Sequence, residues 1–191
     1  TYLCTTGVIT TETINLYTIT AGEVTSHVSG KCAGAVVIPE GVTSIGTGTF
    51  LGASALASIT IPASVTSIGP AAFSRATSLT SVIFASPSAL VSIGYYAFLD
   101  ATSLTSITIP ASVTSIGYMA FAGSNLTTFA VEAGGTSFKA TSDALFTYDG
   151  ATLVAYRTAS TLTAYTIPAG VTSIGQFAFS SAPALQSVNI P

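Results

Sequence analysis

The chain has 191 residues and a formal net charge of −3, and only 6% of its residues are charged, against roughly a quarter in ordinary soluble domains. Its four basic residues, Lys31, Arg75, Lys139 and Arg157, are scattered singly. Nucleic-acid binding requires clustered basic side chains that replace counterions, so this class of partner is excluded. No stretch approaches the ~20 consecutive apolar residues of a membrane-spanning helix, so no membrane span is expected.

Within residues 1–35 the stretch VITTETINLYTI alternates apolar and polar side chains, and Gly22 marks a turn. This pattern predicts strands that form a small β cap on the first repeat. Cys4 and Cys32 are the two cysteines. With His27 as the sole histidine, they cannot complete a structural zinc site. A disulfide that closes the cap is favoured over two buried free thiols, and it would indicate an oxidising, extracytoplasmic compartment.

From residue 36 to residue 191 the chain repeats one pattern, L-x-x-I-x-I-P-x-x-V-T-S-I-G-x-x-A-F, every 22 to 25 residues outside one longer interval. The residue after the apolar triplet anchors each copy: Pro39, Pro62, Ala85, Pro110, Glu132, Pro168 and Pro191. The alternating I-x-I predicts a short strand that proline ends. V-T-S-I predicts a second short strand on the opposite wall, which glycine ends, and Ala-Phe then fills the interior. Because one copy buries too little apolar surface to fold alone, the copies must stack. The expected fold is mainly β, a leucine-rich-repeat solenoid of about seven rungs.

A 36-residue interval between Glu132 and Pro168 interrupts the period. It places alternating residues on both sides of Asp149-Gly150, a dipeptide typical of a type I′ hairpin turn. We therefore expect a β-hairpin inserted at about 138–158 and still stacked in the solenoid. The chain ends at VNIP, in the middle of a repeat. Since an open solenoid end leaves an unpaired strand edge, the natural protein is expected to continue.

This repeat resembles the BspA-like leucine-rich repeats, a family of bacterial and protist surface proteins with units of about 23 residues. The similarity covers about 33–191 and is strongest at 36–50, 56–73, 104–121 and 162–179. The segment SFKATSDALFTYDGATLVAYRT also resembles a hairpin-bearing repeat of that family. The resemblance implies a secreted or cell-surface protein used in adhesion. It implies an extracellular protein or glycan as partner, no enzymatic activity and no cofactor.

The residue types also point away from catalysis. A hydrolase requires a nucleophile, a base and an orienting group within hydrogen-bond reach, and the sole histidine, His27, lies in the cap. Asp143 and Asp149 flank one arm of the expected hairpin. Asp149 is better explained as a turn residue than as half of a catalytic carboxylate pair. No calcium-loop spacing occurs, so neither a catalytic residue nor a metal site is predicted.

Three groups of surface residues are candidates for partner binding. The first flanks the inward-facing residues of the long strands, on the sheet expected to be concave: Ser58, Thr60, Ser81, Ile83, Ser106, Thr108, Thr128, Ala130, Ala164, Thr166, Ser187 and Asn189. These residues form a flat, nearly neutral docking face for a partner, or they are small hydroxyl residues that favour strands and face solvent without a partner.

The second group is the Thr-Ser column of V-T-S-I, whose serines are Ser44, Ser67, Ser92, Ser115, Ser137 and Ser173. Its hydroxyls either satisfy backbone groups at the bend or form an array for ice or another crystalline surface.

The third group is aromatic. Tyr95, Tyr96, Tyr118 and Met119 follow the glycine in adjacent repeats. Exposed rings there would stack on a sugar or anchor a protein partner, and otherwise they act as spacers along the wall. Three functions remain open: a binding or adhesion module, a stalk segment that self-associates end to end, and ice binding. Specificity is expected where the copies differ, at the three tyrosines and the 144–158 hairpin.

Overall fold

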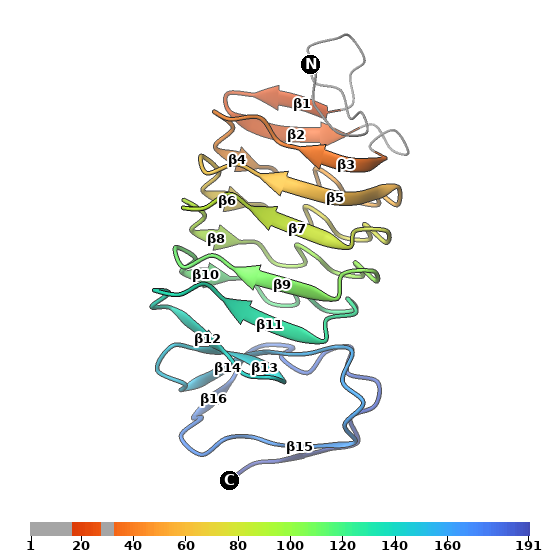
Figure 1. Ribbon diagram of the computed structural model, residues 1–191. Coiled ribbons are helices and arrows are strands. Elements are labelled where there is room, and N and C mark those ends of the chain that lie inside the picture. The colour runs from red at the N-terminus through yellow and green to blue at the C-terminus, as the bar shows by residue number, and fades with distance from the viewer. Residues whose placement is uncertain (1–16, 28–32) are drawn as a thin grey trace.

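The computed structural model describes residues 17–27 and 33–191, and these residues form strands and turns without any α-helix. None of them therefore belongs to a helix that could cross a membrane. The chain winds into a β-solenoid of about seven coils stacked along one axis, with β1 at one end and the C-terminus at the other (Figure 1). The mainly β solenoid that the repeats predict is confirmed.

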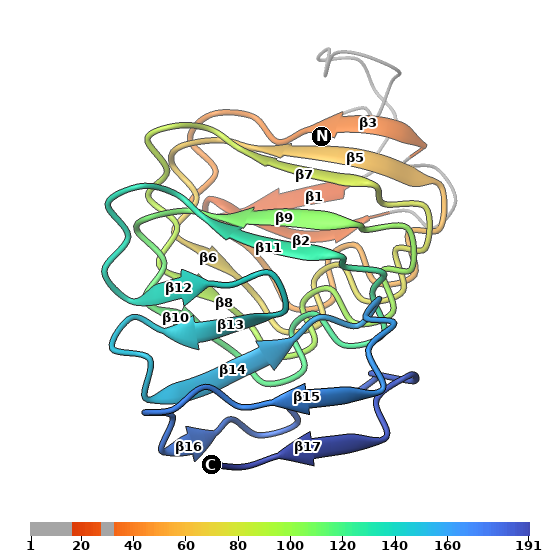
Figure 2. The same cartoon turned by 60° about the horizontal axis from the view of Figure 1, so that its bottom comes forward.

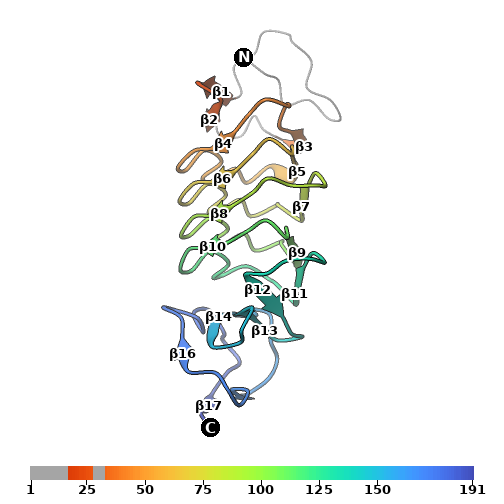
Figure 3. The same cartoon turned by 90° about the vertical axis from the view of Figure 1, so that its left-hand side faces the viewer.

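Two walls of strands run along the solenoid (Figure 3). The long-strand wall consists of three parallel sheets, β3-β5-β7, β9-β11 and β15-β17. Its strands are β3 (Gly34–Val37), β5 (Leu56–Ile61), β7 (Ser81–Phe84), β9 (Ser106–Ile109), β11 (Thr128–Val131), β15 (Ala164–Thr166) and β17 (Ser187–Asn189). The short-strand wall contains the two-residue strands β4 (Ser44–Ile45), β6 (Ser67–Ile68), β8 (Ser92–Ile93), β10 (Ser115–Ile116) and β16 (Ser173–Ile174).

The N-terminal strands β1 (Tyr17–Thr20) and β2 (Glu23–His27) form an antiparallel pair. β2 also pairs in parallel with β4, so the pair extends the short-strand wall at its first end. Cys4 and Cys32 lie outside the described residues, so the disulfide between them stays a prediction. The assignment of residues 1–35 as a separate cap stays a prediction too.

The interior of the solenoid is a column of aromatic rings surrounded by aliphatic side chains. Phe50, Phe73, Phe98 and Phe121 stack nearly parallel, with neighbouring ring centroids 5.2, 5.2 and 5.8 Å apart. The inward-facing leucine and isoleucines of β5 and β9 belong to the same core and are almost fully buried: Leu56, Ile59, Ile61, Ile107 and Ile109. The Ala-Phe pair of each repeat thus fills the interior as expected, and each coil covers the ring of the previous one.

The glycine of T-S-I-G is required by close approach of the coils. A Cβ atom added to Gly69 would lie 2.8 Å from the carbonyl carbon of Gly46, and one added to Gly94 would lie 2.6 Å from that of Gly69. At Gly117 it would overlap the backbone of Tyr95. Real Cβ atoms do not approach backbone this closely, so a side chain at this position would push neighbouring coils apart.

The insertion consists of β12 (Phe138–Ala140), β13 (Ala144–Thr147) and β14 (Thr152–Tyr156), which pair antiparallel in sequence order (Figure 2). β14 also pairs in parallel with β16, so the expected hairpin is confirmed and remains stacked in the solenoid. The expected type I′ turn is wrong, because that turn needs positive φ at both central residues and only Gly150 (φ 78°) has it in this loop. The amide of Gly150 instead donates to the carbonyl of Thr147, so the β-turn is centred on Tyr148 and Asp149, within the loop 148–151 between β13 and β14.

Candidate functional surfaces

The candidate residues of the long-strand wall lie side by side within sheets but not along the whole wall. Ser58 pairs with Ser81 and Thr60 with Ile83 in one sheet, Ser106 pairs with Thr128 and Thr108 with Ala130 in the next, and Thr166 pairs with Asn189 in the last. Ser58, Thr60 and Ser81 are half-buried, whereas Ser106, Thr108, Thr128, Thr166 and Asn189 are exposed. The wall is therefore three short faces and not one continuous docking face.

The threonine hydroxyls of the Thr-Ser column are engaged with backbone. Thr43, Thr66 and Thr114 donate to the carbonyls of Gly22, Thr43 and Val91, at 3.3, 3.1 and 3.4 Å. Each of these carbonyls belongs to the preceding coil, so the hydroxyl helps to bind one coil to the next.

The serine column is also shorter than expected. Ser44, Ser67, Ser92 and Ser115 pair in sequence along the short-strand wall, but the partner of Ser173 is Thr152. Ser137 does not continue the column, because its carbonyl accepts from Tyr148 beside β12. The regular hydroxyl array therefore ends at the insertion.

The tyrosines that follow the glycines form a compact exposed group. The rings of Tyr95 and Tyr118 stack nearly parallel with centroids 5.3 Å apart, and Tyr96 stands nearly perpendicular to both at 5.4 and 5.1 Å. Phe177 joins them, with its ring 5.9 Å from that of Tyr118. We call these four residues the aromatic patch. Tyr95, Tyr118 and Phe177 are 43%, 38% and 52% exposed, so most of the patch faces solvent.

The backbone of the patch is held in a conformation that aromatic residues rarely adopt. Tyr96 and Phe177 both have φ near 59°, in the left-handed region. The same place in the first coil is occupied by Gly48, with φ 62°, and in the second by Ala71. A left-handed residue other than glycine costs about 1–2 kcal/mol. Bulky rings at this position therefore make the fold less stable than glycine would. Backbone strain of this kind often marks functional sites.

The neighbouring rings of the patch alter the pKa of Tyr118. A hydrogen bond with Tyr96 raises the pKa of the Tyr118 hydroxyl above its ordinary value, with burial as a smaller cause. Tyr118 therefore stays protonated throughout the physiological pH range. Among the described residues, no group of three or more His, Cys, Asp or Glu side chains could hold a metal ion.

The two aspartates of the hairpin have structural partners. Asp143 forms an ion pair with Arg157 at 2.7 Å. Asp149 accepts hydrogen bonds from the hydroxyl of Thr147 and the amide of Ala151, and these two bonds lower the pKa of its carboxyl group. Asp149 thus acts as the turn residue that the sequence indicates.

Phe177 is the residue of the patch that the sequence interpretation missed. It lies two positions after Gly175, as Tyr96 and Met119 lie two positions after their glycines. That position relative to the glycine is the signal that could have identified it. The insertion hid the relation, because Gly175 lies 58 positions after Gly117 in the sequence while the solenoid brings their coils together.

Comparison with known proteins gives one family and several structural neighbours. The family model of the BspA type leucine rich repeat region matches residues 29–149 and 154–191, in six copies. PcpA, a pneumococcal vaccine antigen, has a similar structure, with a TM-score of 0.71 and 26% identity over 82% of this chain and 44% of its own. No curated protein sequence matches the chain.

Two further solved structures are similar. A leucine-rich repeat protein of Eubacterium ventriosum has a TM-score of 0.60 and 25% identity, over 87% of this chain and 57% of its own. A leucine-rich repeat protein of T. pallidum has a TM-score of 0.54 and 25% identity, over 90% and 66%. The chain thus spans less than two thirds of the length of the pneumococcal and Eubacterium proteins.

Proposed function

Because the chain belongs to the family of BspA type leucine-rich repeat proteins, we propose that it is a non-enzymatic binding module of an extracellular or cell-surface protein. In this proposal the aromatic patch docks a protein partner, and the repeats are the scaffold that holds the patch. The exposed, stacked rings of Tyr95 and Tyr118, beside Tyr96 on left-handed backbone, carry the proposal. The similarity to a pneumococcal vaccine antigen supports the extracellular location.

The geometry of the patch favours a protein over a sugar. A sugar ring stacks on the face of an aromatic ring. Tyr95 and Tyr118 lie parallel to within 5°, so each covers one face of the other and the pair has less ring face open to a sugar. Tyrosines in such clusters supply large, rigid contact area at protein interfaces, where a few aromatic residues carry most of the binding energy.

The two other candidate functions have weaker support. Ice binding needs a regular array of free hydroxyls, and the threonine hydroxyls donate to carbonyl groups of the preceding coil. End-to-end self-association in a stalk would use the strand edges at the ends of the solenoid and would leave the aromatic patch without a role. We therefore place the partner at the patch.

The test is a pair of arrays, one of extracellular matrix and plasma proteins and one of glycans, probed with the chain at micromolar concentration. We expect binding to one or more proteins and none to the glycans. The matched control replaces two of the four patch residues with those that the first repeat carries in the same places, Tyr95→Thr as at Thr47 and Tyr96→Gly as at Gly48. Silence on the protein array, or equal signals from the wild-type chain and the control, would contradict the proposal.

A further inference from the structure

The long-strand wall is split at one place by a change in the repeat. The corner between β7 and β8 contains seven residues, whereas the corners between β5 and β6 and between β9 and β10 contain five. β7 and β9 are not joined by strand pairing, although they belong to consecutive coils. On the opposite wall β6, β8 and β10 pair without interruption. The longer corner therefore opens a seam on one wall and leaves the other wall intact.

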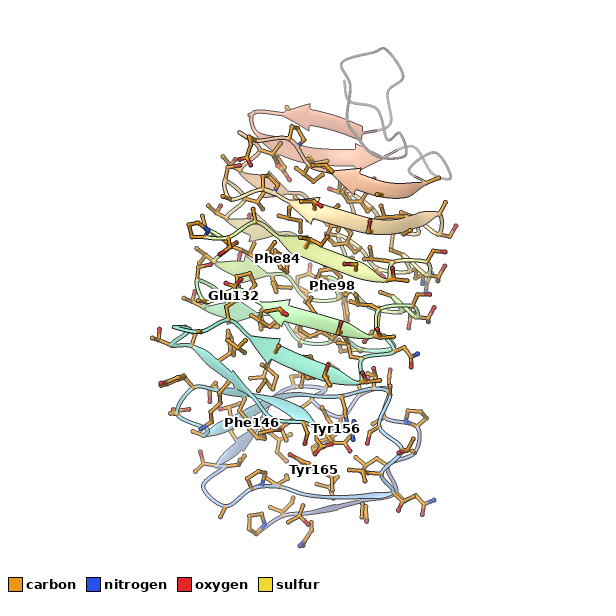
Figure 4. The ribbon with its side chains drawn as sticks, viewed as in Figure 1. Phe84, Phe98, Glu132, Phe146, Tyr156 and Tyr165 are labelled. Carbon is orange, nitrogen blue, oxygen red and sulfur yellow. The ribbon has the colours of Figure 1, made fainter. Side chains whose placement is uncertain are left out.

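The seam contains a hollow of about 310 Å³, lined by Val82, Ile83, Phe84, Thr108 and Glu132. We call it the seam pocket, and Figure 4 shows Phe84 and Glu132 in the same part of the wall. Val82 and Phe84 take the inward positions of their strand, as Ile59 and Ile61 do in β5. The two isoleucines are fully buried, whereas Val82 and Phe84 are half-buried. The seam thus leaves apolar core surface accessible from outside.

Two residues at the pocket depart from the repeat. Ile83 is 50% exposed, beside Thr60 in the same outward column and with Thr108 across the seam. Glu132 stands where most copies have proline, and its Oε2 accepts a hydrogen bond from the amide of Ala111 at 3.2 Å. An exposed isoleucine and a carboxylate therefore replace a threonine and a proline at the same opening.

The carboxylate of Glu132 has no cationic partner in the part of the chain that the structure describes. Arg75 and Arg157 pair with Asp100 and Asp143. The ammonium group of Lys139 lies beside Gly150 in the hairpin. The seam pocket thus combines apolar walls with one unbalanced negative charge, which is the complement of a long cationic side chain.

We propose that the seam pocket binds an arginine side chain presented by a protein partner. The aliphatic stem of the arginine packs on Val82 and Ile83, and its guanidinium group meets Glu132 beside the ring of Phe84. Guanidinium is more weakly hydrated than ammonium and stacks on aromatic rings, so arginine suits a half-buried site better than lysine does. This inference rests on the proposed function in one respect, namely that the arginine belongs to a protein partner. The seam pocket contains no residue of the aromatic patch.

The test is an NMR titration of the 15N-labelled chain with N-acetyl-arginine amide and with its neutral isostere, N-acetyl-citrulline amide. We expect shifts at residues 82–84, 108 and 132, a dissociation constant on the order of millimolar, and roughly three- to tenfold weaker binding of the citrulline compound. Neither probe requires a partner protein, so the outcome is separate from that of the array experiment.

Two variants make the test specific. Glu132→Gln keeps an oxygen that accepts from Ala111 and removes the charge, so it should make the two probes bind equally. Ile83→Thr installs the residue that Thr60 provides in the same outward column, so it should weaken both probes and retain the preference for arginine. The proposal is overturned if the wild-type chain does not respond up to about 10 mM, which is roughly ten times the expected constant, or if the shifts lie elsewhere. It is also overturned if citrulline binds equally or if Glu132→Gln changes nothing.

Discussion

Replacing Gly94 with alanine tests whether the repeat glycine is required by coil spacing. The added Cβ would lie 2.6 Å from the carbonyl carbon of Gly69 and from the nitrogen of Pro70, so the two coils must separate by about 1 Å to restore ordinary contact. The hydrogen bond from the Gly94 amide to the Ile68 carbonyl, now 2.8 Å, would then exceed hydrogen-bond length. Overpacking and the lost bond together should lower the free energy of unfolding by about 2–4 kcal/mol.

The assay is urea unfolding followed by circular dichroism, with Gly41→Ala as the matched control. Gly41 has φ 87° and no atom within 4 Å of an added Cβ, so this control should lose only about 1 kcal/mol from backbone strain. If Gly94→Ala destabilises no more than Gly41→Ala does, close approach of the coils is not the reason for the glycine.

Three further substitutions test the core, the left-handed turns and the hairpin. Phe98→Ala removes a fully buried ring from the middle of the aromatic column. It should lower the free energy of unfolding in urea by about 3–5 kcal/mol. A loss below about 1 kcal/mol would contradict the packing argument. Arg75→Gly should raise the free energy of unfolding by about 0.5–1 kcal/mol, because Arg75 has φ 59° and glycine adopts this left-handed conformation without strain. Little is lost with the side chain, which is 71% exposed and makes only a 3.9 Å ion pair with Asp100. A loss of stability would refute the strain argument. Hydrogen bonds from Thr147 and Ala151 lower the pKa of the Asp149 carboxyl group in the folded state. The ionised carboxylate therefore stabilises the fold at every pH above the ordinary Asp pKa. This stabilisation is lost as the pH falls through the lower, folded-state pKa. Asp149→Asn should therefore flatten the acid limb of a plot of unfolding free energy against pH, and an unchanged slope would count against this linkage.

The repeat pattern was sufficient to predict the solenoid and its two walls, and the interruption of that pattern predicted the hairpin. Each of these follows from local patterns: alternation in I-x-I, proline at the strand end, and Asp149-Gly150 between two alternating runs. The turn type in the hairpin was not predictable from that dipeptide. Asp149 uses its side chain to accept from Thr147 and Ala151, which stabilises a wider loop than the two-residue turn.

The seam and the aromatic patch depend on contacts between coils, which a single repeat does not encode. The two extra residues after Phe84 are visible in the sequence, but whether they disturb one wall or both depends on how β7 and β8 stack. Phe177 meets Tyr118 because the insertion takes one place in the stack without interrupting it. Sequence reasoning found the three tyrosines because they depart from the copies around them, and it missed the member that lies beyond the insertion.

The most direct measurement of the central claim compares two surfaces in one binding assay. The wild-type chain, a patch variant (Tyr95→Thr, Tyr96→Gly, Tyr118→Thr) and a wall variant (Thr128→Lys, Thr166→Lys) are titrated by biolayer interferometry against immobilised extracellular matrix and plasma proteins. We predict that the wild-type chain binds at least one of them, that the patch variant binds it more than about tenfold more weakly, and that the wall variant binds it as the wild type does. Binding that survives in the patch variant and is lost in the wall variant, or no binding by the wild-type chain, would contradict the account.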